Sequence, residues 1–369
     1  MPTLDDELYM WRCLHLAQIG KGHTAPNPMV GSVVVCDGRV LGEAWHTQYG
    51  KPHAEREAIA RVSPADLPLL PRATIYVNLE PCAHYGKTPP CADYIIECGI
   101  RRVVVACTDP FAQVAGRGIA RLRQAGIEIV TGVLEREAWW LNRRFMVFQQ
   151  YRRPYIILKW AQTADGYFAP TDASQRWISN PDTQVLCHRW RSEEAAVMVA
   201  TRTAQADNPQ LNVRHWQGGK MPVRIAIDRH YALPQHIHLL DGTQPTLIFG
   251  EQGFEPNHPH LSKPHPLRYI SLAPAPDLLP QIWQQLYDLQ LQSVLVEGGA
   301  NLLNQLIDNH IWDEARVFTA PTRWHEGIPA PLLPPQQAQL IQQQYLGDNL
   351  YSHYINTTFH PKATTAFLE

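Results

Sequence analysis

The chain has 369 residues, 45 % of them hydrophobic, and a formal net charge of −2. This length favours two domains over one, and the near-zero charge gives no global basic field that would indicate nucleic acid as a partner. No apolar run is long enough to cross a bilayer, and the first residues lack the basic and apolar regions of a signal peptide. The seven cysteines show no disulfide-like framework. We therefore expect a cytoplasmic protein without a membrane partner.

The first 150 residues predict a compact α/β unit of about five strands. Asp5 or Asp6 is expected to cap a helix that ends near Gly20. Apolar runs rich in β-branched residues then predict strands at 30–35, 40–44, 74–79, 102–106 and 127–131. Apolar residues at helical spacing predict helices at 53–61, 91–98 and 119–125.

One imidazole and two thiols occur in order within this unit, in His53-Ala54-Glu55, Pro81-Cys82 and Pro89-Pro90-Cys91. They are a sufficient ligand set for a catalytic Zn²⁺, which keeps its fourth position for water and lowers the pKa of that water. Glu55 is then free to shuttle protons. This order of residues is typical of the zinc deaminases that act on nucleobases.

The spacing of the two cysteines differs from that of the nucleic-acid deaminases. Eight residues separate Cys82 from Cys91, whereas those enzymes have two. The insertion carries His84 and Lys87, which suits a wall of the substrate pocket. The alternatives are buried structural cysteines, or a structural zinc that needs a fourth ligand. The ordered set as a whole favours the catalytic zinc.

A helical pattern from Leu134 to Gln150 precedes Pro154, and we place the domain boundary there. The zinc domain is expected at 1–150 and a second domain at 151–369. The basic residues around the boundary are interpreted as a solvated helix face and linker, rather than a nucleic-acid patch. These residues are Arg143, Arg144, Arg152 and Arg153.

The second half predicts another α/β pattern, with strands at 155–161, 195–200, 223–228, 246–249 and 293–297. The last of these strands runs into Gly298-Gly299-Ala300-Asn301, which opens a helix. A glycine pair before a helix N-terminus suits close approach of an anion. From these residues alone an ordinary tight turn is the favoured alternative. We assign no chemistry to the Gln-rich segment beyond about residue 330.

Taken together, the two halves resemble the bifunctional riboflavin biosynthesis deaminase/reductases (the RibD family). The resemblance covers roughly residues 5–320. In the first half it is carried by 26–31, 42–46, 50–55, 79–91 and 113–118, and in the second half by 159–166, 176–179, 206–214 and 296–299. The eight-residue spacing between the cysteines is especially specific.

The resemblance implies a cytidine-deaminase-like three-layer domain followed by a dihydrofolate-reductase-like α/β domain. The first domain would hydrolyse an exocyclic amine of 2,5-diamino-6-ribosylamino-4(3H)-pyrimidinone 5′-phosphate. The second would use NADPH to reduce 5-amino-6-(5-phosphoribosylamino)uracil to the ribityl product. A homodimer is a further expectation from the family.

The resemblance also implies roles for individual residues. Glu55 would be the catalytic proton shuttle, and the zinc ligands would be His53, Cys82 and Cys91. Cofactor contacts would be Ala161, Trp177, Thr203, Asp207, Gly299, Ala300, Asn301, Leu302, Leu303, Asn304 and Gln305. Substrate contacts would be Asn27, His46, Lys87, Lys159, Arg191, Leu211, Arg214 and Glu297, with Arg191 and Arg214 as phosphate clamps.

Several positions depart from the family pattern. Phe111-Ala112 stands where Asn-Pro is usual, and Gln175 and Arg229 stand where the family has a Ser that contacts substrate and cofactor respectively. Thr163 replaces a Ser and keeps the hydroxyl. These departures motivate an alternative in which the chain is a deaminase only and its second domain binds a nucleotide or holds an oligomer. An RNA-editing deaminase and a zinc-stabilised structural module are further alternatives.

Overall fold

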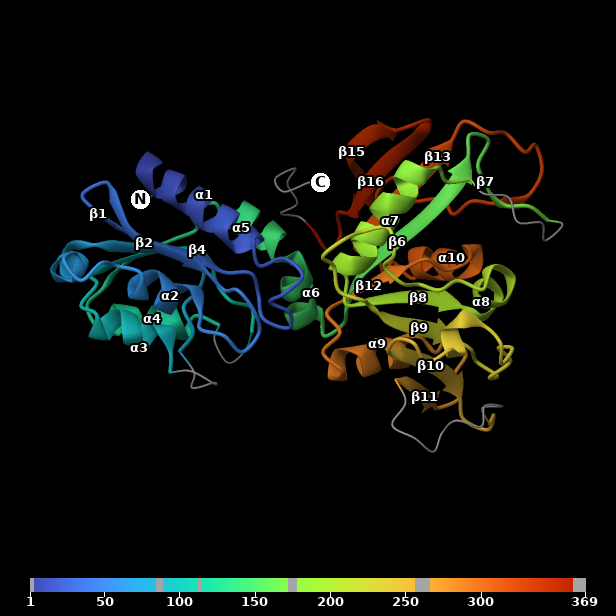
Figure 1. The fold of residues 1–369 in the computed structure, drawn as a ribbon, viewed down its shortest axis with the longest axis horizontal. Coiled ribbons are helices and arrows are strands. Elements are labelled where there is room, and N and C mark those ends of the chain that lie inside the picture. The colour runs from blue at the N-terminus through green and yellow to red at the C-terminus, as the bar shows by residue number, and fades with distance from the viewer. Residues whose placement is uncertain (1–2, 84–88, 112–114, 172–177, 256–265, 361–369) are drawn as a thin grey trace. The chain divides into compact units, whose positions relative to one another are not determined.

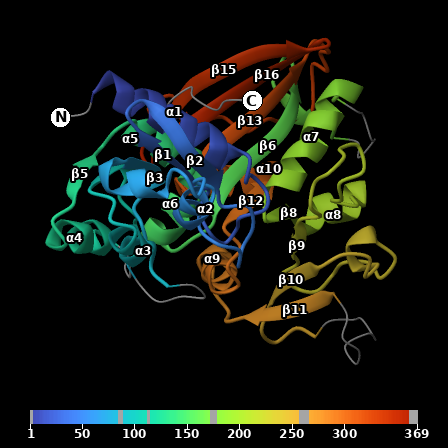
Figure 2. The same ribbon diagram turned by 60° about the vertical axis from the view of Figure 1, so that its left-hand side comes forward.

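The structure is a computed structural model that describes residues 3–83, 89–111, 115–171, 178–255 and 266–360. The chain divides into one compact unit that extends to Tyr151 and a second that starts at Arg152. Each unit is an α/β layer structure (Figures 1 and 2), and the α/β class predicted for both halves is confirmed. In the described residues, no helix has both the length and the apolar character needed to cross a bilayer.

The first unit is built on a sheet in the order β2-β1-β3-β4-β5. Strand β1 runs antiparallel to β2 and β3, whereas β3, β4 and β5 are parallel. The strands are β1 Gly31–Cys36, β2 Arg39–Trp45, β3 Thr74–Leu79, β4 Arg102–Cys107 and β5 Glu128–Thr131. The helices are α1 Leu4–Gln18, α2 Ala54–Ala60, α3 Cys91–Glu97, α4 Arg117–Gln124, α5 Glu135–Leu141 and α6 Arg143–Tyr151, with a 3₁₀ turn at Leu67–Arg72.

Two glycines let helices pack directly on this sheet. A Cβ atom on Gly31 would lie 2.1 Å from the carbonyl oxygen of Cys13 in α1, and one on Gly42 would lie 2.2 Å from that of Ala58 in α2. Figure 1 shows α1 and α5 on one face of the sheet and α2, α3 and α4 on the other. The unit therefore has three layers, and the loops at the strand ends remain for chemistry.

The second unit is built on a sheet in the order β11-β10-β9-β8-β12-β6-β13-β16-β15. The seven strands from β11 to β13 in this sheet order are parallel to one another. Strands β16 and β15 continue the sheet as an antiparallel edge. The strands are β6 Tyr155–Thr163, β7 Tyr167–Ala169, β8 Ala196–Ala200, β9 Val223–Ile227, β10 Thr246–Glu251, β11 Leu267–Leu272, β12 Ser293–Val296, β13 Glu314–Ala320, β14 Ile328–Pro329, β15 Ala338–Leu346 and β16 Asn349–Asn356. The helices are α7 Pro181–Glu193, α8 Thr201–Asp207, α9 Leu279–Asp288 and α10 Ala300–Asp308, with a 3₁₀ turn at His238–Leu240.

Two local predictions about these elements were wrong. Helix α1 begins earlier than expected because Thr3 is its N-cap, and Asp6 closes a capping box by accepting from the Thr3 amide. The helix predicted from Leu134 to Gln150 is interrupted at Asn142, whose side chain is hydrogen-bonded to the main chain of Met29 instead.

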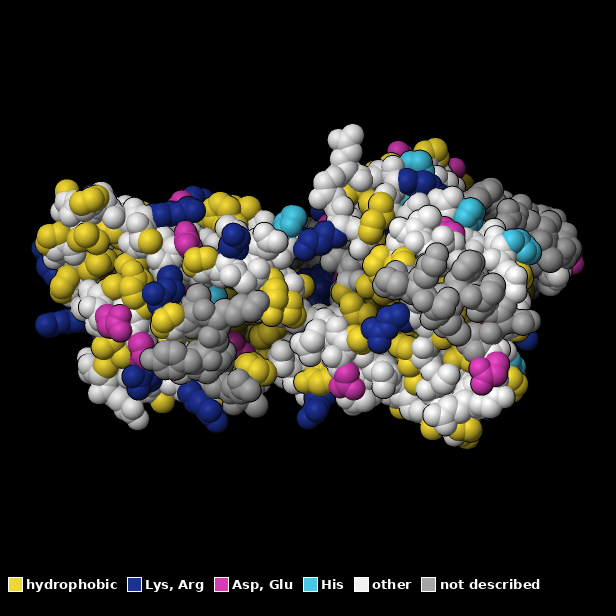
Figure 3. All heavy atoms as spheres, turned by 60° about the horizontal axis from the view of Figure 1, so that its bottom comes forward, with side chains coloured by type: hydrophobic (Ala, Val, Ile, Leu, Met, Phe, Trp, Pro, Cys, Tyr) yellow, Lys and Arg dark blue, Asp and Glu magenta, His cyan; other side chains and the backbone are white. Residues whose placement is uncertain are grey.

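The basic residues at the boundary are not all solvated. Arg143 is 8 % exposed, and its guanidinium lies over the Trp140 ring and donates to the Trp140 carbonyl. Arg153 is 9 % exposed and donates to both carboxylate oxygens of Asp313 at 2.6 and 2.9 Å. On the face shown in Figure 3, the basic side chains of the described residues are scattered rather than gathered in a stripe.

Candidate active sites

The predicted zinc ligands meet at one edge of the first sheet. Strands β2, β3 and β4 run in the same direction, so their carboxyl ends share that edge. His46 follows β2, Cys82 follows β3 and Asp109 follows β4. The site is therefore positioned as sites in α/β sheets generally are, beyond the carboxyl ends of the strands.

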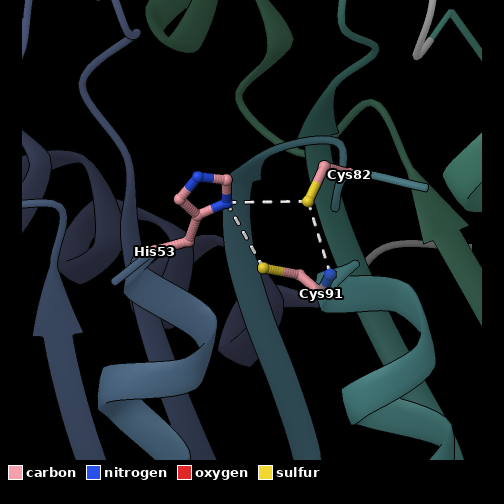
Figure 4. A group of neighbouring side chains, drawn as sticks. All are labelled: His53, Cys82 and Cys91. Atoms are coloured by element: carbon pink, nitrogen blue, oxygen red, sulfur yellow. Dashed lines mark hydrogen bonds between the residues drawn. The ribbon is translucent and has the colours of Figure 1, made fainter. Parts of the chain in front are cut away.

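His53, Cys82 and Cys91 point their donor atoms toward one another (Figure 4). The Nδ1 atom of His53 lies 3.6 Å from the Cys82 sulfur and 3.4 Å from the Cys91 sulfur. His53 is the N-cap of α2, and Cys91 is the first residue of α3. In the described residues, these three are the one group of potential ligands whose atoms all lie within 4.8 Å of one another.

This arrangement fits a zinc ion with three protein ligands. A tetrahedral zinc at ordinary bond lengths holds nitrogen and sulfur donors about 3.6 Å apart, which agrees with the separations at His53. One imidazole and two thiols are also the donor types that zinc prefers. Three protein ligands are the number that a catalytic zinc takes, and the described residues add no fourth ligand.

The two thiols differ in protonation. A hydrogen bond from the Cys91 thiol, with further hydrogen bonds from the Cys91 amide and the His53 ring, lowers the pKa of Cys82 to about 4 despite burial. The hydrogen bond with Cys82, followed by burial, raises the pKa of Cys91. Both thiols must be deprotonated to bind a metal, so metal binding would release the proton of Cys91.

Glu55 lies in the first turn of α2, two residues after His53, and is 3 % exposed. Burial raises the pKa of Glu55, although the neighbouring His53 opposes this effect. Its carboxyl group is within hydrogen-bonding reach of the Cys91 thiol. A buried carboxyl with a raised pKa beside the ligand set is suited to accept and return a proton.

Asn27 and His46, the predicted pyrimidine contacts, lie together beside this centre. The His46 Nδ1 atom is 3.0 Å from the Pro52 carbonyl oxygen, which can only accept, so this nitrogen carries the proton. Its Nε2 atom then accepts from the Asn27 amide at 3.1 Å. The His46 ring lies edge-on to His53, with centroids 5.5 Å apart. Lys87, the third predicted contact, lies outside the described residues.

A second cluster of charges, partly buried, lies in the second unit. Arg191 of α7 donates to both oxygens of Glu297, at 2.6 and 2.8 Å, and Lys159 of β6 lies 3.8 Å from the same carboxylate. Burial raises the pKa of Glu297, but the two cations outweigh it and hold this pKa at about 2. The three predicted substrate residues thus form one ionised group, with one carboxylate facing two cations.

The other predicted substrate residues lie in the segment after α8. Leu211 is buried, with φ of +49°, and Arg214 is exposed. The Arg214 main-chain amide donates to His188 Nδ1 at 3.3 Å, and its guanidinium donates to the Asn212 side chain at 2.9 Å. Arg191 is fully engaged with Glu297 and the Asn212 carbonyl, so its role as a phosphate clamp stays a prediction.

The predicted cofactor turn lies where β12 leads into α10. A Cβ atom on Gly299 would lie 2.9 Å from the Thr203 hydroxyl, so this turn packs against α8, which ends at Asp207. Ala161 lies near the end of β6 on the same sheet edge. Ala300 and Leu303 are buried, Asn304 is exposed, and Trp177 lies outside the described residues.

A cavity of about 210 Å³ adjoins this turn and is lined by the predicted contacts Asn301, Leu302 and Gln305. Its other walls come from the ends of β8 and β9 and from the start of α9, and they include Arg229 and Asp277. Sequence reasoning treated Arg229 only as a departure. Its basic side chain directly after a predicted strand was the signal that could have indicated a role in the cavity.

Two other departures can be placed. Thr163 is fully buried, and its hydroxyl donates to Asp165 and accepts from the Tyr167 amide, so it shapes a turn. The Phe111 amide donates to the Asp109 carboxylate at 2.8 Å. Gln175 lies outside the described residues. Sequence reasoning also gave no role to Glu80, which is buried two residues before Cys82.

Comparisons with known proteins cover both units. Residues 3–107 match the family model of the cytidine and deoxycytidylate deaminase zinc-binding region, and residues 154–323 match the RibD C-terminal domain. The riboflavin biosynthesis protein RibD of Aquifex aeolicus is 39 % identical over 88 % of this chain and 89 % of its own length. That of Escherichia coli K12 is 36 % identical over 86 % and 88 %.

Two solved structures of RibD-type proteins also match this chain over most of its length. The chain is similar to the crystal structure of a diaminohydroxyphosphoribosylaminopyrimidine deaminase/5-amino-6-(5-phosphoribosylamino)uracil reductase from Thermotoga maritima, with a TM-score of 0.83, 32 % identity and coverage of 95 % and 98 % of the two chains. It is similar to Acinetobacter baumannii RibD with a TM-score of 0.84, 32 % identity and coverage of 95 % and 99 %. The predicted order, a cytidine-deaminase-like domain followed by a reductase domain, is confirmed. The chain therefore belongs to the RibD family of riboflavin biosynthesis proteins.

Proposed function

We propose that this chain is a bifunctional enzyme of riboflavin biosynthesis, with a deaminase in residues 1–150 and a reductase in residues 151–369. One observation carries the proposal: the chain holds both the centre of His53, Cys82 and Cys91 with Glu55 and the partly buried cluster of Lys159, Arg191 and Glu297. The match of residues 154–323 to the reductase family model favours two activities over a deaminase alone.

The deaminase step exchanges an exocyclic amine of 2,5-diamino-6-ribosylamino-4(3H)-pyrimidinone 5′-phosphate for a carbonyl oxygen. His53, Cys82 and Cys91 would hold a zinc ion, which would supply a water of lowered pKa as the nucleophile. Glu55 takes the proton from the water and returns it to the leaving nitrogen, so that ammonia departs. Asn27 and His46 orient the pyrimidine, with the Asn27 amide held by the neutral His46 ring.

The reductase step converts 5-amino-6-(5-phosphoribosylamino)uracil to its ribityl form, which adds a hydride and a proton to the ribosyl chain. Lys159, Arg191 and Glu297 bind and orient this substrate, with Arg214 at its phosphate. Lys159 and Arg191 outnumber the single carboxylate of Glu297, so the cluster suits a phosphorylated substrate. The turn from Gly299 to Gln305 and the adjoining cavity would hold the nicotinamide cofactor, which would supply the hydride.

The test gives the zinc-loaded protein this diaminopyrimidinone substrate, with and without NADPH, and follows ammonia and NADPH absorbance separately. Ammonia under both conditions, with NADPH consumed only after deamination, is the expected result. Ammonia without NADPH consumption would support the deaminase-only alternative. If the zinc-loaded protein released no ammonia, the proposed substrate would be wrong.

NADPH rather than NADH is the proposed reductant. Arg229 is the basic residue among those lining the cavity, and a guanidinium suits the 2′-phosphate that distinguishes NADPH. Arg229 now pairs with Glu251, so phosphate would have to compete with that carboxylate. We expect Arg229→Ser to lower the ratio of kcat/KM for NADPH to that for NADH by about tenfold or more. Arg202, an exposed residue of α8, is the other candidate for this role, so Arg202→Ser is compared with Arg229→Ser. An unchanged ratio in Arg229→Ser would exclude Arg229 as the reader.

We also propose that the protein is a homodimer in the cytoplasm, as the family resemblance implies. Light scattering on the purified protein tests the assembly, since a particle of one chain mass would contradict it.

A further inference from the structure

Glu80 is a buried carboxylate that lies between the end of β3 and the zinc ligand Cys82. It is 4 % exposed. One carboxylate oxygen accepts from the main-chain amides of Asp109 and Gly116, at 3.3 and 2.9 Å. The other accepts from those of Gly118 and Ile119, at 2.9 and 3.1 Å. The connection from β4 into α4 therefore provides a cradle of amides around this one side chain.

The cradle lies directly against the turn that carries the ligand. A Cβ atom on Gly118 would lie 1.9 Å from the Pro81 carbonyl oxygen and 3.2 Å from the Glu80 carboxylate. Only glycine permits the start of α4 to approach the chain this closely. The Glu80 main-chain amide also donates to the Cys107 carbonyl at 2.9 Å. The main-chain amide of Glu80 thus binds the end of β4, and its carboxylate binds the start of α4.

Cys82 is held from its other side by α3. The Ala92 amide donates to the Cys82 carbonyl at 3.1 Å, and the Cys91 amide donates to the Cys82 sulfur at 3.3 Å. The Pro81–Cys82 turn is therefore clamped between α3 and the cradle around Glu80. If the cradle opened, the contacts with α3 and His53 are those that would remain for Cys82 among the described residues.

We propose that Glu80 is a positioning residue of the metal centre, which acts through Cys82. Its carboxylate draws the β4–α4 connection onto the Pro81–Cys82 turn and so keeps the Cys82 sulfur in place for the ion. The proposal rests on the proposed zinc deaminase function. It explains why the side chain is a carboxylate, since four amide donors need the acceptor capacity of two oxygens, whereas a glutamine offers one oxygen and two additional donors.

The test compares Glu80→Gln with Asp6→Asn in the full-length, zinc-loaded protein. Asp6 is a matched control because it is also buried and hydrogen-bonded, to Thr3, Tyr76 and Arg102, but belongs to α1 and contacts no ligand. Three quantities are measured: zinc loss to a chromophoric chelator, the visible spectrum of the cobalt-loaded protein and the melting temperature of the metal-free protein.

Both variants are expected to lower the melting temperature. Only Glu80→Gln is expected to speed zinc loss, by about tenfold or more, and to alter the cobalt spectrum, because removing support from a ligand typically costs about 10–100-fold in metal affinity. Wild-type zinc loss and cobalt spectrum in Glu80→Gln, with a melting temperature lowered as in Asp6→Asn, would overturn the proposal. These readouts need no substrate, so an error in the substrate assignment would not affect them.

If Glu80→Gln does not fold, Glu80→Asp replaces it, since Asp keeps both acceptor oxygens on a shorter side chain. Faster zinc loss in Glu80→Asp supports the proposal, and wild-type zinc loss with a lowered melting temperature overturns it.

Discussion

Glu55 is the residue on which the deaminase chemistry depends most directly. It is buried beside the ligand set, and its pKa is raised, yet it is not one of the three ligands. Its carboxyl group can therefore exchange a proton within the site. A glutamine has nearly the same shape but cannot carry that proton.

We expect Glu55→Gln to fold and to retain zinc, while the rate of ammonia release falls by about 10²–10⁴-fold. Zinc content by elemental analysis and ammonia release by a coupled assay are the two measurements. Glu57→Gln, in the same helix, is the control and should keep the wild-type rate. Normal ammonia release from Glu55→Gln would mean that Glu55 is not the proton shuttle of the reaction.

The clustering of His53, Cys82 and Cys91 could be predicted because their order and spacing in the chain carry that signal. His53, Cys82 and Cys91 were each expected at a strand end or helix start, and the structure places them there. The support around them could not be predicted. Glu80 is bound by main-chain amides some thirty to forty residues later in the chain, and a main-chain donor leaves no trace in residue types.

At the scale of elements, α1 is tied to the sheet by Asp6. The carboxylate accepts from Arg102 at the start of β4 and from the Tyr76 hydroxyl of β3. Burial opposes ionisation of Asp6, but the hydrogen bonds with Arg102, Thr3 and Tyr76 lower its pKa to about 2 from an ordinary 3.8. The ionised form therefore stabilises the folded state above about pH 4, and this contribution is lost as the pH falls toward 2.

We expect Asp6→Asn to be less stable than the wild type at pH 7, by on the order of 2 kcal/mol, and this difference to shrink between pH 4 and pH 2. Amide hydrogen exchange in β3 and β4 measures the stability of the first unit separately from that of the second. Other carboxylates, such as Asp313, titrate equally in both proteins and cancel in the comparison. A difference that stays constant down to pH 2 would contradict the assignment.

The break between α5 and α6 shows where periodicity is insufficient. Apolar spacing continues through Asn142, so the sequence predicts one helix, but Asn142 is 3 % exposed and makes two hydrogen bonds with the main chain of Met29. Its side-chain amide is hydrogen-bonded to main-chain groups just before β1, more than a hundred residues earlier in the chain. Such a non-local partner can override the local helical preference, and no window of sequence contains both residues.

Asn142→Ala should therefore weaken the deaminase rather than only lengthen a helix. Loss of the asparagine leaves the Met29 amide without its acceptor, at a cost of about 1–3 kcal/mol. Because Met29 lies two residues after Asn27, we expect a higher KM for the pyrimidine substrate with kcat less affected. Steady-state kinetics separate these two constants, and an unchanged KM would show that Asn27 is held independently of Met29.

At the scale of the whole molecule, the α/β class and most element positions could be predicted, but the sheet of the second unit could not. Strand β6 pairs with β12 and β13, which lie well over a hundred residues later, and β13 pairs with β16 in the Gln-rich tail. Periodicity identifies strands but not their partners. The segment beyond residue 330, to which no chemistry was assigned, supplies the antiparallel edge of that sheet.

The described residues of each cluster belong to one unit. The ligands and Glu55 belong to the first unit, and Lys159, Arg191 and Glu297 belong to the second. The two activities should therefore be separable within the intact chain. Removal of zinc with a chelator should lower the rate of ammonia release by at least about 100-fold. The rate of NADPH consumption should stay unchanged when the deaminated intermediate is supplied.

Glu297→Gln should give the converse result. Replacing the carboxylate by a neutral amide leaves Arg191 and Lys159 buried without their counter-charge, so NADPH consumption should be lost while ammonia is released at the wild-type rate. Both assays use the same preparation, and the wild-type protein is the common control. Loss of NADPH consumption on chelation, or of ammonia release in Glu297→Gln, would show that the units act as one catalytic body despite their separate residue sets.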